Sequence, residues 1–232
     1  MIPPVNLRSK SGMILVIETS GAVCGAALHD GKNMVAFRET VQSRVHDTLL
    51  LSQIREVMED RDITVNDLDA VAVSLGPGSF TGIRIGLSVA KALCYSLKKP
   101  IIPVPTLDAL ASAAAAKAGS FDRIYTAIAA TSGKLFFCSY DTKGNRLEEY
   151  RQKSTSEFFP VNGEKILVIG DAESYFKGDC FASGGEEYHV PHVRFVAEHA
   201  AVLYSAKKIE YDARSVIPLY VTEITHRTAA KV

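Results

Sequence analysis

Short apolar runs and one amphipathic stretch organise the first part of the chain. Ile14 to Glu18 is aliphatic, Val23 to Leu28 consists mainly of small residues, and Met34 to Thr40 alternates between apolar and polar residues. With Asp30-Gly31 as a turn before the third run, this pattern predicts three strands. From His46 to Asp60, apolar residues recur at helical spacing with charges between them, which predicts an amphipathic helix.

A glycine-rich turn joins the next predicted strand to a second helix. Asp69 to Leu75 has the pattern of a buried strand, Gly76 to Gly82 follows it, and the helical pattern ends near Lys98-Lys99-Pro100. Ile101 to Val104 predicts a further strand. Three strands, a helix, a strand, a helix and a strand is the element order of one ribonuclease H-like lobe.

The second half repeats this order in a weaker form. Strand-like runs cover Arg123–Ala130, Lys134–Asp141, Leu147–Lys153 and Lys165–Gly170, Lys143-Gly144-Asn145 is a predicted turn, and an alanine-rich helix is predicted over Phe195–Ile209. The fold class is therefore predicted to be α/β, with two ribonuclease H-like (actin-like ATPase) lobes and a smaller, divergent second lobe.

The predicted domain boundaries follow from these elements. Residues 13–107 form the first lobe with its helices, and residues 108–232 form the smaller second lobe. Residues 1–12 are polar and contain two prolines. They are interpreted as a native tail or an expression remnant.

Composition narrows the function classes. Lys plus Arg and Asp plus Glu both total 26 in 232 residues, so no net charge attracts a phosphate backbone or an anionic membrane. No signal peptide or apolar stretch long enough to span a bilayer is evident, and we expect a cytoplasmic protein without membrane contact. The four cysteines are too far apart for a zinc or redox motif: Cys24, Cys94, Cys138 and Cys180.

The segment from Gly76 to Gly82 is the most informative one. Glycines at a strand-to-helix turn permit positive φ angles and close approach of another backbone or a phosphate. The candidate nucleotide-proximal residues are Gly76, Pro77, Gly78, Ser79, Thr81 and Gly82. Because the segment lacks the Lys-Ser/Thr ending of a P-loop, a tight turn with close packing is the simpler interpretation of the glycines alone.

Other familiar chemistry has little support in the sequence. His189, His192 and His199 lack neighbouring cysteines or carboxylates that would complete a metal site, and His46 at a helix start is interpreted as a surface or capping residue. Neither Gly-x-Ser-x-Gly nor His-Glu-x-x-His occurs. We therefore predict no catalytic and no metal-binding residues in this chain.

One longer string identifies a family. Leu75 to Gly86 reads LGPGSFTGIRIG and resembles the TsaB family, also called YeaZ. The resemblance extends to ILVIETS at 14–20, PVPTL at 103–107 and PLYV at 218–221, so it covers nearly the whole chain from Met13.

The resemblance implies a function in tRNA modification. TsaB proteins are bacterial subunits that act with TsaD and the ATPase TsaE to place threonylcarbamoyl on the adenosine beside the anticodon of tRNAs that read ANN codons. TsaD is the catalyst and TsaB its dimerisation partner. We therefore expect a heterodimer with TsaD, a homodimer when the chain is alone, and contact with tRNA through the complex. ATP and a TsaD-bound metal would serve the complex, with no cofactor in this chain.

The positions at which this chain departs from its catalytic relatives agree with a division of roles in which TsaD is the catalyst and TsaB its partner. Where TsaD carries two metal-binding histidines, this chain has Thr106 and Leu110. The first strand carries Glu18 in place of the aspartate usual in actin-like ATPases. Relatives also carry an acidic residue where this chain has Ala129-Ala130-Thr131.

The helix after the glycine turn has apolar residues on two faces. Ile83, Leu87, Ala90, Cys94 and Leu97 form one stripe, and Ile85, Val89 and Leu93 form another. Periodicity alone leaves open whether the second stripe is core or interface. Since TsaB proteins pair through these helices, the resemblance favours an interface formed by Leu50, Ile54, Met58, Ile85, Val89 and Leu93.

Two alternative functions stay open at this point. One is a small actin-like ATPase or sugar kinase with its own site between the lobes. The other is a homodimeric, glycoprotease-like protein.

Overall fold

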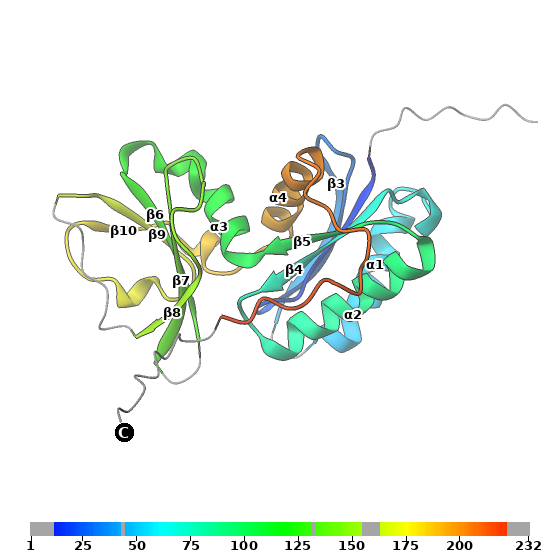
Figure 1. Cartoon of the computed structure of the whole chain (residues 1–232), viewed down its shortest axis with the longest axis horizontal. Helices are drawn as coiled ribbons and strands as arrows, with labels where there is room; N and C mark the ends of the chain where they lie inside the picture. Colours follow the sequence, from blue (N-terminus) through cyan, green and yellow to red (C-terminus); the bar gives the residue numbers. More distant parts are fainter. Residues whose placement is uncertain (1–11, 43–44, 131–132, 155–162, 222–232) are drawn as a thin grey trace, which may run out of the picture.

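The computed structural model describes residues 12–42, 45–130, 133–154 and 163–221. Most of the predicted tail lies outside these ranges. Figure 1 shows two lobes, each built around its own sheet. Among the described residues, every helix is too short or too polar to cross a bilayer.

The first sheet has five strands in the order β3-β2-β1-β4-β5. The strands are β1 (Ile14–Glu18), β2 (Val23–His29), β3 (Met34–Val41), β4 (Ala70–Gly76) and β5 (Ile101–Pro105). β1, β2 and β3 are antiparallel neighbours, whereas β4 runs parallel to β1 and β5 parallel to β4. Both faces of β1, β2 and β4 are buried, which explains their nearly continuous apolar sequences.

Helices cover both faces of this sheet. α1 (His46–Glu59) and α2 (Phe80–Leu97) lie on one face, and α4 (Val193–Ser205) lies on the other (Figure 1). The alanines of α4 are buried with the small residues of β2 and β4, so this helix approaches the sheet closely. The first lobe is therefore a three-layer α/β/α sandwich.

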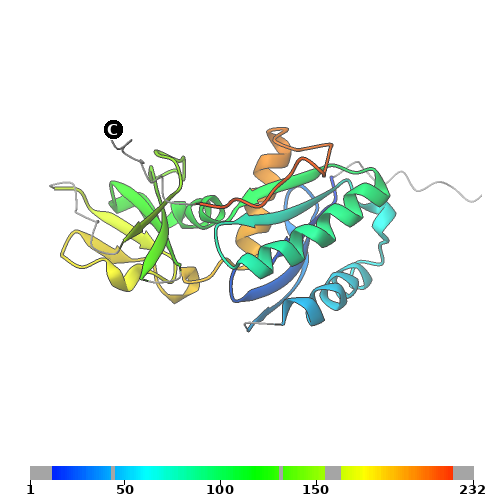
Figure 2. The ribbon, with the colours of Figure 1, turned by 60° about the horizontal axis from the view of Figure 1, so that its bottom comes forward.

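The second sheet repeats the order of the first. β6 (Arg123–Ala129), β7 (Lys134–Tyr140), β8 (Arg151–Ser154), β9 (Ile166–Ile169) and β10 (Phe181–Ser183) lie in the order β10-β9-β6-β7-β8. Here too, the first three strands are antiparallel and the last two are parallel additions. The predicted pair of ribonuclease H-like lobes is confirmed, and Figure 2 shows the second lobe as the smaller one.

A helix missed by the sequence analysis lies where the lobes meet. α3 (Thr106–Ala114) follows β5 directly and packs against the second sheet and α4. Short 3₁₀ turns complete the described elements, at Val65–Asp67, Ala115–Ser120, Glu173–Tyr175 and Glu186–Tyr188.

Some predicted bounds are wrong in detail. The strand predicted from Leu147 begins at Arg151, because regular pairing with β7 is interrupted after Leu147, whose N donates to Ser139 O at 2.9 Å, and resumes at Arg151 opposite Phe137. α4 begins at Val193, two residues earlier than predicted. It ends at Ser205 because Lys207, with φ of 56°, is left-handed.

The last described segment returns to the first lobe. Glu210 and Ile101 exchange backbone hydrogen bonds of 2.9 Å, and Leu219 N donates to Leu75 O at 2.9 Å. With α4, residues 193–221 thus pack on the first lobe, because one face of its sheet would otherwise expose apolar side chains. The predicted boundary after Leu107 places residues 193–221 in the second lobe, whereas in the structure they pack on the first.

Candidate functional site: an inter-lobe cleft and an adjoining helix groove

A cleft of about 1150 Å³ lies between the lobes. The first lobe contributes the turn after β1, the glycine segment and the start of α2, and the second lobe contributes Ile128, Phe136 and Asp171. Leu219 to Val221 of the returning segment line it as well. Ligands of open α/β folds bind outside the carboxyl ends of the strands, where this cleft lies.

The glycine segment forms the turn predicted for it. Gly76 has φ of 99°, in the left-handed region that glycine tolerates. Ser79 Oγ then caps α2 by accepting a 3.2 Å hydrogen bond from Gly82 N, and Ser79 N donates to Ser20 O at 2.7 Å. The segment is thus tied to the turn after β1.

Close packing explains the later glycines. A Cβ added at Gly78 would lie 2.1 Å from Ser20 O, and one added at Gly82 would lie 2.1 Å from Thr19 O. At Gly86 it would lie 2.2 Å from Thr19 Oγ1. Of the candidate residues, Pro77, Gly78, Ser79, Thr81 and Gly82 line the cleft and Gly76 does not, and this packing accounts for Gly78 and Gly82 without a phosphate.

Replacing Gly82 by alanine is expected to destabilise the protein by about 1–3 kcal/mol. Alanine ordinarily stabilises a helix interior by about 1 kcal/mol relative to glycine. At Gly82 the added methyl group would lie 2.1 Å from Thr19 O, so the substitution is expected to lower the stability of the protein instead of raising it. Urea unfolding measures the effect. Gly119→Ala is the control, because a Cβ added at Gly119 would meet no atom within 4 Å, and equal stability of both variants would contradict this account.

The side chain of Glu18 stabilises the turn after β1. Its side chain is fully buried, and its Oε1 accepts hydrogen bonds from Ser20 N and Ser20 Oγ at 2.5 and 2.7 Å. Burial raises the pKa of Glu18 from 4.5 to about 7, although the Ser20 hydrogen bonds oppose the shift. The carboxyl group therefore holds the turn and is not exposed in the cleft.

The raised pKa of Glu18 predicts that stability falls as pH rises from 4.5 towards 7. Between these pH values the folded protein binds more protons than the unfolded chain. The stabilisation that the protonated Glu18 carboxyl contributes is therefore complete below pH 4.5 and is lost as this carboxyl ionises in the folded protein. The slope is at most about 1.4 kcal/mol per pH unit for one group. Urea midpoints measured across this range should show a smaller fall in Glu18→Gln; an identical fall would contradict the assignment.

Asp171 is a cleft residue that the sequence analysis missed. It follows β9 and Gly170, and its Oδ1 accepts a 2.7 Å hydrogen bond from Ala129 N. Burial is the main cause that raises the pKa of its carboxyl group. An acid directly after a buried strand was the available signal. Ala129 and Ala130 line the cleft beside it, whereas Thr131 lies outside the described residues.

Two of the three histidines considered as metal ligands, His189 and His192, have structural partners, whereas the buried Nδ1 of His199 has no hydrogen-bond partner among the described residues. His189 Nε2 lies 2.7 Å from Glu173 Oε1, and His192 Nδ1 lies 2.9 Å from Glu39 Oε1. His46 is buried against Val23 O rather than being a surface residue, which corrects that interpretation. Within the described ranges, no three His, Cys, Asp or Glu side chains gather as metal ligands.

A second hollow of about 530 Å³ runs between α1 and α2. We call it the helix groove; Leu50, Leu51, Ile85 and Val89 supply its apolar lining, and Asp47 and Arg84 its charges. It adjoins the inter-lobe cleft, because the two share residues at the starts of both helices.

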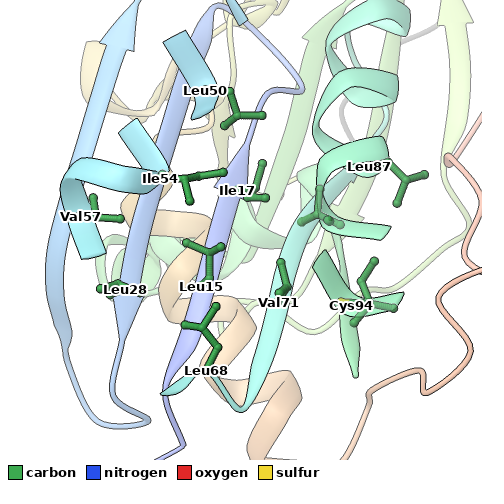
Figure 3. Packing of buried hydrophobic residues seen from close by; sticks show 14 of the residues in the cluster. Leu15, Ile17, Leu28, Leu50, Ile54, Val57, Leu68, Val71, Leu87 and Cys94 are labelled. Atoms are coloured by element: carbon green, nitrogen blue, oxygen red, sulfur yellow. The ribbon is translucent and has the colours of Figure 1, made fainter. Parts of the chain in front are cut away.

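Three predicted interface residues belong to the core. Leu50, Ile54 and Met58 are only 1%, 7% and 7% exposed and lie in the cluster between α1 and the sheet. Figure 3 shows Leu50 and Ile54 directed towards β1 and β2. The single apolar face of α1 thus covers the sheet, and an interface role for these three residues stays a prediction.

The exposed apolar residues of the groove come mainly from other positions. Leu51 of α1 is 64% exposed and was missed, because three consecutive leucines hide which one faces outward. Ile85, Val89 and Leu93 are partly exposed on α2, whereas Ile83, Leu87, Ala90 and Cys94 are buried. The two stripes of α2 thus differ in burial, and an interface role for the outer one stays a prediction.

Sequence comparisons give consistent matches. The family model described as "TsaD: tRNA N6-adenosine threonylcarbamoyltransferase" matches residues 39–229. A protein of Haemophilus influenzae named tRNA threonylcarbamoyladenosine biosynthesis protein TsaB is 32% identical, covering 91% of this chain and 94% of the relative. The TsaB protein of Buchnera aphidicola subsp. Schizaphis graminum is 37% identical, covering 69% of this chain and 79% of the relative.

A solved structure supports the fold. YeaZ from Pseudomonas aeruginosa superimposes with a TM-score of 0.78 at 22% sequence identity, covering 90% of this chain and 100% of that chain. At this identity the likeness is evidence for the two-lobed fold alone.

Proposed function

The chain belongs to the TsaB (YeaZ) family, and from that premise we propose that it is a non-catalytic subunit in the biosynthesis of threonylcarbamoyladenosine in tRNA. In this proposal it forms a heterodimer with a TsaD protein and acts with TsaE on the adenosine beside the anticodon of tRNAs that read ANN codons. The tRNA, the ATP and the metal are engaged through the complex.

The positions that depart from the catalytic relatives support a non-catalytic role. Thr106 and Leu110, which stand where TsaD has metal-binding histidines, are fully buried in this chain. Leu110 is part of the core between α3 and the second sheet. Glu18, which replaces the usual aspartate, is buried and bonded to Ser20.

The helix groove is the observation that carries the partner role. It combines an apolar lining with exposed Leu51 and partly exposed Ile85 and Val89. An amphipathic helix of a partner can lay its apolar face into such a groove. Two helices from each subunit would then form a four-helix contact, and a second copy of this chain could occupy the same surface when TsaD is absent.

Reconstituted transfer of threonylcarbamoyl from threonylcarbamoyl-adenylate to tRNA tests the proposal. The assay compares the TsaD protein, this chain and their mixture, each with TsaE. Product is expected from the mixture only. Product from this chain without TsaD would favour an enzyme with its own site, and unchanged product on omitting this chain would exclude a required subunit.

A further inference from the structure

Arg84 is held in one orientation at the edge of the helix groove. Its guanidinium carbon lies 3.7 Å from the ring centroid of Phe80, and its Nε donates a 2.9 Å hydrogen bond to the hydroxyl of Tyr220. The two rings stack on each other with centroids 5.5 Å apart. A residue 136 positions further along the sequence thus helps to fix this arginine on α2.

The backbone of the returning segment positions Tyr220. Its neighbour Leu219 donates to Leu75 O at 2.9 Å, and Lys91 Nζ donates to Arg214 O at 3.3 Å further along α2. Val216 between these points is buried in the first-lobe core. The hydroxyl that holds Arg84 therefore belongs to a residue that directly follows a segment anchored to the first lobe at Arg214, Val216 and Leu219.

The charge of Arg84 has no acidic partner among the described side chains. Other arginines in this part of the molecule have acidic partners, as for Arg38 with Glu56 and Arg55 with Glu59, whereas Arg84 contacts Phe80 and Tyr220. Arg84 is exposed and lines the groove beside Ile85 and Ser88. Its guanidinium is thus oriented, charged and open to an incoming group.

Such an arginine is suited to recognition. Fixing a long side chain beforehand reduces the entropy lost on binding, and a guanidinium offers a planar fork that matches a carboxylate. Arginine and tyrosine beside an apolar patch are also the residue types that dominate binding energies at interfaces.

We propose that Arg84, preorganised by Phe80 and Tyr220, selects a partner helix whose apolar face carries an Asp or Glu side chain placed against the guanidinium. This inference rests on the proposed function, since it assumes that the helix groove receives the TsaD partner. The positive charge of Arg84 favours an acidic side chain on the partner helix, and the apolar lining of the groove favours an apolar helix face. Tyr220 and Phe80 are positioning residues in this recognition.

Replacing Arg84 by glutamine tests the proposal. Binding to the purified TsaD protein, measured by calorimetry at several NaCl concentrations, is expected to weaken about tenfold or more and to lose part of its salt dependence. Arg55→Gln is the matched control, because Arg55 lies on the exposed side of α1 outside the groove and should change affinity less than about twofold. Equal affinity and equal salt dependence of wild type and Arg84→Gln would overturn the proposal.

A milder change isolates the positioning effect. Tyr220→Phe removes only the hydroxyl that holds Arg84, so affinity should fall about two- to fivefold, roughly the value of one hydrogen bond, with the salt dependence retained. No loss in this variant would exclude positioning by Tyr220. If wild type fails to bind the TsaD protein, the proposed function fails; if a groove variant such as Val89→Glu abolishes binding while Arg84→Gln does not, only this inference fails.

Discussion

Replacing Val89 by glutamate is expected to abolish association with the TsaD partner while the monomer stays folded. Val89 lies on the outer stripe of α2, is partly exposed and lines the helix groove. In the complex its side chain would be enclosed between helices, where an unpaired carboxylate costs several kcal/mol. In the free chain the glutamate can reach water. Size-exclusion chromatography with light scattering measures the mass of the assembly.

Val202→Glu is the matched control for this experiment. Val202 is 60% exposed on α4, which covers the opposite face of the first sheet. The same substitution there should leave both stability and association unchanged. Association that survives in Val89→Glu, or that is lost equally in Val202→Glu, would place the partner surface elsewhere.

Replacing Leu50 by alanine is expected to reduce the free energy of unfolding by about 2–5 kcal/mol. Leu50 is 1% exposed and packs with Ile17, Ile54 and the rest of the cluster between α1 and the sheet (Figure 3). Removal of its side chain beyond Cβ would leave a cavity under the helix. Urea unfolding of the isolated chain measures this directly.

The neighbouring leucine provides the contrast. Leu51 is 64% exposed, so Leu51→Ala should change stability by less than about 0.5 kcal/mol while weakening partner binding. If the two variants had similar stabilities, the orientation of α1 described above would be wrong.

The order of elements along the chain and the repetition of the lobe could be predicted because they depend on local patterns. The aliphatic run at β1, the Asp30-Gly31 turn and the glycine segment each fix a strand or a helix start from a few residues. α3 was missed because it has only nine residues and follows β5 directly, with no turn between them to mark its start. The return of α4 to the first lobe depends on contacts between residues far apart in the sequence, which periodicity does not specify.

The candidate site was predictable to a similar extent. The glycine segment was located, and periodicity distinguished two apolar stripes on α2 but left open which of them is exposed. The burial of Leu50, Ile54 and Met58 against the sheet was not predicted, because an amphipathic helix shows where its apolar side is but not what covers it. The contact between Arg84 and Tyr220 joins distant parts of the chain and left no local signal.

Titration of this chain into a fixed amount of TsaD protein in the transfer assay, with TsaE, threonylcarbamoyl-adenylate and tRNA present, tests the central claim most directly. If the chain is a non-catalytic subunit of a heterodimer, product formation should rise with added chain and level off at one chain per TsaD molecule. Product formation in the absence of TsaD, or a rate that is independent of this chain, would contradict the account.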